Sequence, residues 1–177
     1  MKKTVLTFGL ISGVIISVLM DSSLLLSSKI GSGHSMLLGY TIMVASFLLV
    51  YFGIRSYRDN VLAGGISFGR AFACGILITL ITCVFYVVTW EILYFNFIPH
   101  FMDSYWAAQI HKVQAAGLDP ATTAAKVAAL QQSQQSYQNP VINMAYTFME
   151  PLPVGLLITL ISATVLRRKA RVEPAVA

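Results

Sequence analysis

The chain has 177 residues, of which 56% are apolar and only 11% are charged, and its mean hydropathy is +0.73. Soluble domains average about 25% charged and about 45–50% apolar residues, so these values exclude an ordinary soluble enzyme and a disordered chain. A small disulfide scaffold is excluded because Cys74 and Cys83 are the only cysteines. The net charge of +5 would suit nucleic acid, but the basic residues lie at the ends of apolar runs, which is typical of a membrane protein.

Four apolar runs are long enough to span a bilayer, which takes about 20 residues of helix. They cover about residues 4–26, 36–54, 71–97 and 141–166. The first run has the basic start of a signal peptide, but it is too long and no A-x-A cleavage site follows, so we expect it to be retained. The sequence therefore predicts an all-α, integral membrane four-helix bundle. We expect a single membrane domain over residues 1–171 and a disordered tail over residues 172–177.

The basic residues predict how the spans are oriented. If the N-terminus is cytoplasmic, nine of the twelve Lys and Arg residues fall on the inside, and only Lys29, Lys112 and Lys126 fall outside. Basic residues favour the cytoplasmic side of a membrane, so both termini are expected to be cytoplasmic, in the inner membrane of a bacterium. The inner set is Lys2, Lys3, Arg55, Arg58, Arg70, Arg167, Arg168, Lys169 and Arg171.

Residues 99–140, between the third and fourth spans, form the only soluble-looking segment. Apolar residues at helical spacing over residues 101–113 predict one helix, which Gly117 ends. Asp119 followed by Pro120 is typical of a helix start, and an Ala- and Gln-rich helix is expected to follow. This pattern predicts an exterior helical hairpin, which serves either as a structural cap or as a recognition element.

Three carboxylates lie inside the predicted spans, where each costs about 2.5–3.5 kcal/mol to insert. At helical rise, Asp21, Glu91 and Glu150 lie about 27, 31 and 25 Å from the inner ends of their spans, near the outer edge of a core about 30 Å thick. His34 and His100 lie at the same level in the outer loops. These residues form either a site for a cation, a proton or a ligand, or a set of acids that are hydrated or bonded to neighbouring groups. The neighbours available to Glu91 along the chain are Tyr86, Trp90 and Tyr94. No spacing resembles a metal-ligand motif, so we predict neither a metal nor a cofactor.

Glu150 is followed by Pro151 and Pro153, which remove two backbone donors and disfavour helix before them. The fourth span is therefore expected to kink or to restart here. A restarted helix would direct its positive N-terminal end at the outer acidic residues. Such breaks occur at transporter binding sites and also as inert kinks, and the sequence leaves both interpretations open.

Two further features have both a functional and a structural interpretation. Arg70, at the inner end of the third span, is expected to extend to the interface, with a pair to Asp59 or a lipid phosphate as the alternative. Gly9 and Gly13 form a G-x-x-x-G motif that permits close helix packing, within the bundle or at a homo-oligomer seam.

The segment GILITLI at residues 75–81 is repeated as GLLITLI at residues 155–161. Spans three and four run in opposite directions in the predicted topology, so a simple duplication does not explain the likeness. We attribute it to the few residue types that spanning helices use.

Five short motifs are spread along nearly the whole chain. They are GHSMLLGY at residues 33–40, RSYRD at 55–59, ISFGRAF at 66–72, WE at 90–91 and EPLPVG at 150–155. With them the chain resembles a bacterial membrane family catalogued as a domain of unknown function, DUF4199. The resemblance covers residues 3–169 and implies four-helix integral membrane proteins with no assigned activity. It includes His34, Arg70, Glu91 and Glu150.

No G-x-S-x-G, Walker, H-E-x-x-H or G-x-G-x-x-G motif is present, and no nucleic-acid module is recognised. The leading hypothesis is a non-enzymatic, multi-pass inner-membrane protein that acts as an assembly partner or envelope-system component, with a membrane or periplasmic protein as its partner. The alternative is a small proton- or cation-coupled transporter or channel that uses the intramembrane carboxylates. A third hypothesis is a lipid-modifying enzyme with His34 as general base.

Overall fold

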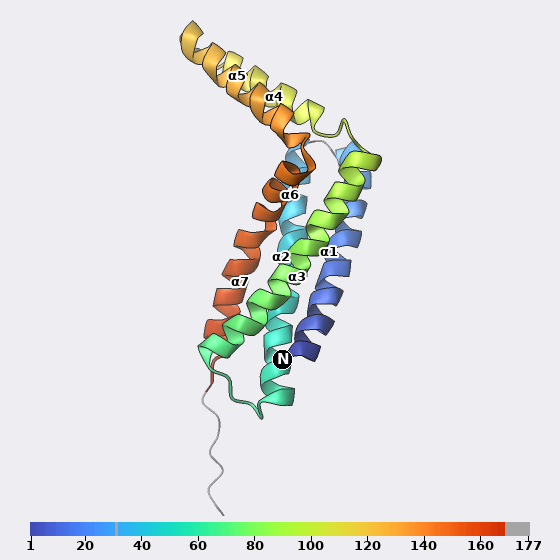
Figure 1. The fold of residues 1–177 in the computed structure, drawn as a ribbon, viewed down its shortest axis with the longest axis vertical. Coiled ribbons are helices and arrows are strands. Elements are labelled where there is room, and N and C mark those ends of the chain that lie inside the picture. The colour runs from blue at the N-terminus through green and yellow to red at the C-terminus, as the bar shows by residue number, and fades with distance from the viewer. Residues whose placement is uncertain (31, 169–177) are drawn as a thin grey trace, which may run out of the picture. The chain divides into compact units, whose positions relative to one another are not determined.

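The computed structural model describes residues 1–30 and 32–168, and it describes side chains outside residues 25–36. The predicted tail at residues 172–177 lies outside the described residues. Helices make up most of the described chain (Figure 1). In chain order they are α1 (Lys2–Ile30), α2 (Ser32–Val61), α3 (Phe68–Asn96), α4 (Asp103–Gln114), α5 (Pro120–Tyr137), α6 (Pro140–Met149) and α7 (Pro151–Leu166).

Four helical segments are long and apolar enough to span a membrane: Lys2–Leu24, Leu37–Val61, Phe68–Asn96 and Pro140–Leu166. This finding confirms the predicted fold class, an all-α bundle of four membrane spans with a helical hairpin between the third and the fourth. α2 continues past the predicted end at residue 54, to Val61. Its last two turns carry Arg55 and Asp59, which form an i,i+4 ion pair at 3.6 Å and support the helix where the apolar run stops.

The chain groups into two compact units. The first contains residues 1–86 together with the chain from Phe148 onward, and so holds α1, α2, α7 and the first part of α3. The second is Val87–Thr147, which holds the rest of α3, the helices α4 and α5, and most of α6.

The first unit has a closely packed interior and an apolar exterior. Ile16, Phe47 and Ile54 are completely buried, whereas Val18 and Leu48 on the same helices are about half exposed. Soluble proteins rarely expose large continuous apolar surfaces. An outer surface of this kind is what lipid chains solvate.

Gly9 and Gly13 bring α1 close to α3. A Cβ atom on Gly9 would lie 2.8 Å from Cδ1 of Ile81, and one on Gly13 would lie 2.5 Å from Cγ of Phe85. Both distances are too short for real contacts, so any larger residue would require Ile81 or Phe85 to shift. The G-x-x-x-G motif thus has a role within the bundle, and a homo-oligomer is not required to explain it.

One end of the first unit gathers the start of α1, the α2–α3 turn and the end of α7 (Figure 1). Ile66 in the turn and Arg168 after α7 exchange two backbone hydrogen bonds of 2.9 Å. Arg58 of α2 donates from Nη1 to the carbonyl of Leu166, the last residue of α7, at 3.4 Å. A cation at a helix C-terminus is favoured by the helix dipole. Most of the basic residues of the predicted inner set lie at this end.

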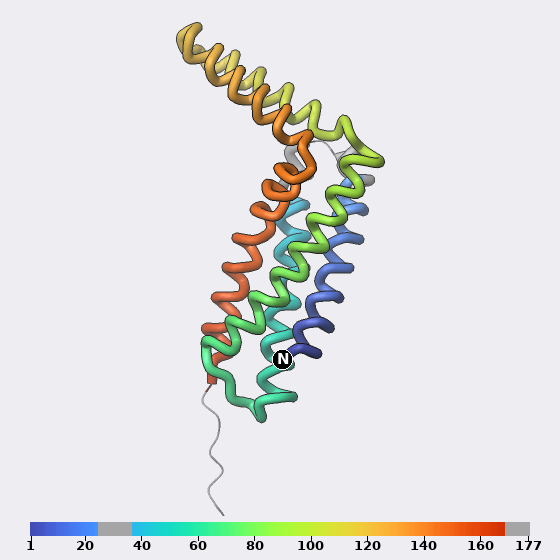
Figure 2. The backbone as a smooth tube through the Cα atoms, in the orientation of Figure 1, coloured from blue at the N-terminus to red at the C-terminus, as the bar shows by residue number. Residues whose placement is uncertain are grey.

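The helices α4 and α5 run side by side as a hairpin (Figure 2). Gly117, with φ +66°, takes the left-handed conformation that ends the first helix region. Asp119 caps α5 by accepting a 2.9 Å hydrogen bond from the Thr122 amide, and Pro120 is the first helical residue. Neither helix contains a buried residue. The hairpin is thus formed by local signals rather than around a core of its own.

Candidate functional site

Glu150 lies at the interruption of the fourth span, between α6 and α7. It accepts a 2.9 Å hydrogen bond at Oε2 from the Tyr86 hydroxyl of α3. Its backbone keeps helical angles, φ −75° and ψ −56°, so the chain does not turn away there. The interruption arises because Pro151 and Pro153 supply no backbone N–H. The result is a carboxylate with a phenol donor, placed in a spanning segment and immediately before the first turn of α7.

Glu91 lies in the second unit, and its surroundings differ. Its Oε1 atom is buried and has no hydrogen-bond partner among the described residues. The aromatic groups that we considered as its partners bond elsewhere: Trp90 donates from Nε1 to the Tyr137 hydroxyl at 3.1 Å, and Gln138 donates to the Tyr94 hydroxyl at 2.9 Å. Among the described residues, Glu91 is therefore the carboxylate that has a buried oxygen atom without a hydrogen-bond partner.

An aromatic cluster surrounds these two hydrogen bonds. Trp90 stacks on Tyr94 with ring centroids 5.8 Å apart, and Tyr137 contacts Tyr94 at 5.5 Å and Trp106 at 6.2 Å. These separations are those of rings in contact, so the rings fill the space between them. The cluster thus fixes the end of α5 against α3 and is not an open cage for a ligand.

The remaining predicted site residues each have surroundings of their own. Asp21 is an exposed residue of α1, and the His34 side chain lies outside the described residues. His100 is exposed and pairs with Asp103 at 2.9 Å. Within the described chain there is no group of three or more His, Cys, Asp or Glu residues that could hold a metal ion.

Asp59, the alternative partner expected for Arg70, pairs in the structure with cations of its own helix. Asp59 bonds Arg58 at 2.7 and 3.1 Å, and its pair with Arg55 closes one helical turn of α2. These cations precede Asp59 on the same helix, so they reach it without crossing the α2–α3 turn. Arg70 is exposed at the start of α3, and its backbone amide bonds the Ser67 hydroxyl.

Sequence reasoning missed the partner of Glu150. Tyr86 lies close to Glu91 along the chain, so the sequence predicts it as a neighbour of Glu91. The structure instead joins Tyr86 to a residue 64 positions away. The sequence signal that bears on this pairing is the repeated GxLITLI segment, because its two copies lie in α3 and α7 and bond each other.

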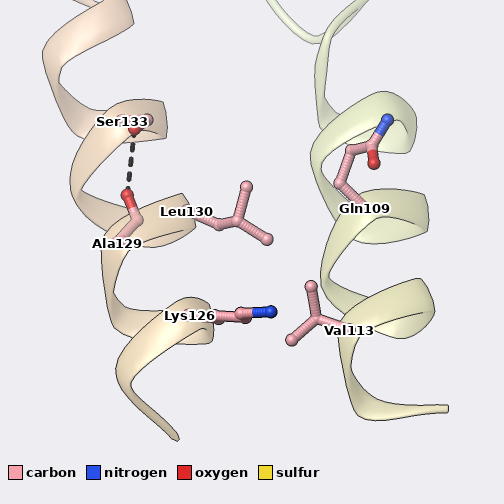
Figure 3. Close-up of a pocket in the computed structure, with 6 residues that line it drawn as sticks. All are labelled: Gln109, Val113, Lys126, Ala129, Leu130 and Ser133. Carbon is pink, nitrogen blue, oxygen red and sulfur yellow. Dashed lines mark hydrogen bonds between the residues drawn. The ribbon is translucent and has the colours of Figure 1, made fainter. Parts of the chain in front are cut away.

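A shallow groove of about 300 Å³ runs between α4 and α5 (Figure 3). Val113 of α4 and Leu130 of α5 face each other across it, and Lys126 reaches toward α4 one turn earlier on α5. The lining residues are Gln109, Val113, Lys126, Ala129, Leu130 and Ser133. The Ser133 hydroxyl bonds the Ala129 carbonyl at 2.9 Å and so does not extend into the groove as a free donor.

The spans and the hairpin together define an α-helical, multi-span membrane protein. Over residues 7–168 the sequence matches the family described as "Protein of unknown function (DUF4199)", and the chain belongs to that family. No curated protein and no solved structure matches the chain. The family assignment agrees with the resemblance found in the motifs, and it attaches no reaction to them.

Proposed function

We propose that this protein is a non-enzymatic membrane protein whose α4–α5 hairpin binds a partner protein outside the bilayer. The observation that carries the proposal is the hairpin itself. Neither of its helices contains a buried residue, and Val113 and Leu130 face each other across an open groove between them (Figure 3). These side chains are available to the apolar residues of a partner helix.

The charges of the hairpin favour an acidic partner. Lys126 is the only charged residue that lines the groove. The two carboxylates of the hairpin are engaged locally, Asp103 with His100 and Asp119 with the Thr122 amide. A helix that lays apolar residues on Val113 and Leu130 and carries a carboxylate opposite Lys126 would complement the groove.

Crosslinking in the cell tests this role. A photoreactive residue replaces either Leu130 in the groove or Ala128, an exposed residue of α5 that does not line it. We expect a discrete crosslinked product from position 130 only, and its loss when Lys126→Glu is added, because that change repels an acidic partner. Equal crosslinking from both positions, or crosslinking that survives Lys126→Glu, would contradict the proposal.

We further propose that both termini are cytoplasmic in a bacterial inner membrane, so that the hairpin faces the periplasm. The support is the bias of Lys and Arg toward one set of span ends. Single cysteines at the exposed residues Ser67 and Ser104 test it in a background without the two native cysteines. A membrane-impermeant maleimide added to intact cells should label position 104 only. Labelling of position 67 instead would show that the protein has the opposite orientation.

A second candidate function is proton- or cation-coupled transport. The supporting observation is the Tyr86–Glu150 hydrogen bond beside the interrupted fourth span. In proteoliposomes, proton or cation flux should fall when Glu150→Gln removes the titratable carboxyl group, while Asp21→Asn, on an exposed part of α1, should retain the flux. Absence of flux with the unaltered protein would reject this candidate.

A further inference from the structure

The repeated segment brings two distant parts of the first unit into direct contact. Residues 75–81 belong to α3, which leaves the end of the unit where α7 finishes, so the two helices are antiparallel (Figure 1). Thr79 is the fifth residue of one copy and Thr159 is the fifth residue of the other. Their hydroxyl oxygens lie 3.0 Å apart and hydrogen bond, and both side chains are completely buried.

The first residues of the two copies contact the same threonines reciprocally. A Cβ atom on Gly75 would lie 2.8 Å from Cγ2 of Thr159. A Cβ atom on Gly155 would meet Cγ2 of Thr79 even more closely. Each glycine therefore leaves room for the threonine methyl group of the opposite copy. The four residues thus form two reciprocal Gly–Thr contacts, as expected when one sequence packs antiparallel against itself.

The Tyr86–Glu150 pair continues this register. Tyr86 lies seven residues after Thr79, which is two turns along the same face of α3. Glu150 lies five residues before Gly155 in the fourth span, which runs antiparallel to α3. Moving outward along α3, the partners in the fourth span are thus met in descending order: Thr159, Gly155 and then Glu150.

We propose that the two copies of G-x-L-I-T-L-I are an inverted repeat that joins α3 to α7, and that this seam holds Glu150 within reach of Tyr86. In lipid there is no hydrophobic force between helices, so close approach at glycines and interhelical hydrogen bonds supply the association. The seam has both. Gly75, Thr79, Gly155 and Thr159 are positioning residues, and the inference does not depend on what the hairpin binds.

A double-mutant cycle tests the reciprocal packing. Gly75→Ala places a methyl group against Thr159, and we expect the thermal midpoint in detergent to fall by about 4 °C. Thr159→Ser removes the Cγ2 atom that blocks the new methyl group but keeps the hydroxyl. The new Cβ would still lie 2.9 Å from Cδ1 of Ile54, but this atom is the far end of a flexible side chain and can shift, so the double variant should regain most of this loss. Gly39→Ala is the matched control, because a Cβ there meets nothing within 4 Å. If the two changes are simply additive, the reciprocal packing is wrong.

The mirror cycle predicts a smaller recovery. Gly155→Ala combined with Thr79→Ser removes the same kind of clash, but the new Cβ would still lie 2.7 Å from Cε1 of Phe47 on α2. We therefore expect partial recovery only. Full recovery, or none, would contradict the proposed geometry of the seam.

Chemical labelling tests whether the seam positions Glu150. A hydrophobic carbodiimide reacts with carboxyl groups in membranes, and mass spectrometry reports Glu150 separately from Asp21. Thr159→Val keeps the shape of the side chain but removes the hydroxyl. We expect it to change the labelling rate of Glu150 about threefold and to leave that of Asp21 unchanged, with Thr159→Ser retaining the original rate. An unchanged rate at Glu150 in both variants would show that the seam does not position it.

Discussion

The α3–α7 seam and the α4–α5 hairpin are both helix pairs, but they are stabilised in different ways. In the seam, Thr79 and Thr159 are completely buried and bond each other, and Gly75 and Gly155 admit the opposite side chains. In the hairpin no residue is buried. The seam therefore depends on distant residues that fit one another, whereas each hairpin helix depends mainly on signals in its own segment.

This difference determines how far the structural effect of a substitution extends. A side chain added to the seam has no space to enter, so it must displace α7 or fail to pack. A change in the hairpin affects a helix whose surroundings are open, and its consequence stays local. We therefore expect the largest losses from substitutions in the packed interior and the smallest from changes in the hairpin.

The largest effect is expected from Gly155→Leu. Its Cβ alone would overlap Thr79 and lie 2.7 Å from Phe47, so α7 cannot keep its position. We expect a loss of more than about 3 kcal/mol in stability and an aggregated profile in size-exclusion chromatography. Gly39→Leu should elute as the unaltered protein does, because residue 39 has open space. Similar elution profiles for the two variants would contradict the distinction between glycines in the packed interior and glycines with open space around them.

Gly13→Ala should lower stability by about 1–3 kcal/mol, because the new methyl group meets the Phe85 ring at 2.5 Å. Thermal unfolding in detergent measures the loss. Native mass spectrometry distinguishes bundle packing from a homo-oligomer seam: the mass distribution should not change. Dissociation of an oligomer in this variant would show that Gly13 faces another copy of the chain.

Tyr86→Phe should cost about 0.6 kcal/mol and at most about 1.7 kcal/mol, the range measured for hydrogen bonds between spanning helices. The ring stays in place, so the change removes only the hydroxyl that donates to Glu150. The exposed Tyr40→Phe is the matched control in α2 and should have no effect. A loss of several kcal/mol for Tyr86→Phe would indicate that the hydroxyl has a larger role than one hydrogen bond.

The smallest effect is a pH dependence of α5. Hydrogen bonds from Thr122 hold the pKa of Asp119 below its usual value. A carboxylate with a lowered pKa in the folded state stabilises the helix above the ordinary pKa of about 3.9, and this contribution is lost as the pH falls through the lowered value. Protection of the Thr122 and Thr123 amides from hydrogen exchange should therefore decline in acid. Asp119→Asn keeps a cap without the titration, so it should abolish the extra decline, and an identical decline in both proteins would contradict the assignment.

The sequence alone determined the features that depend on local composition. Runs of apolar residues predict the four spans, and the cap at Asp119 and the glycine at position 117 predict the start of α5 and the end of the helix before it. The prolines after Glu150 likewise coincide with the interruption between α6 and α7. Each of these signals acts within a few residues, through hydrogen bonding or φ preference, so it can be read without knowing the fold.

Only the tertiary structure decided which faces of the spans meet. Apolar side chains suit both lipid and the helix interior, so hydropathy does not show which side of a span is packed. For this reason the sequence placed Tyr86 near Glu91 and treated the GxLITLI repeat as compositional. The fold pairs Tyr86 with Glu150 and Thr79 with Thr159, because the antiparallel packing of α3 and α7 brings together residues that are 64 and 80 positions apart.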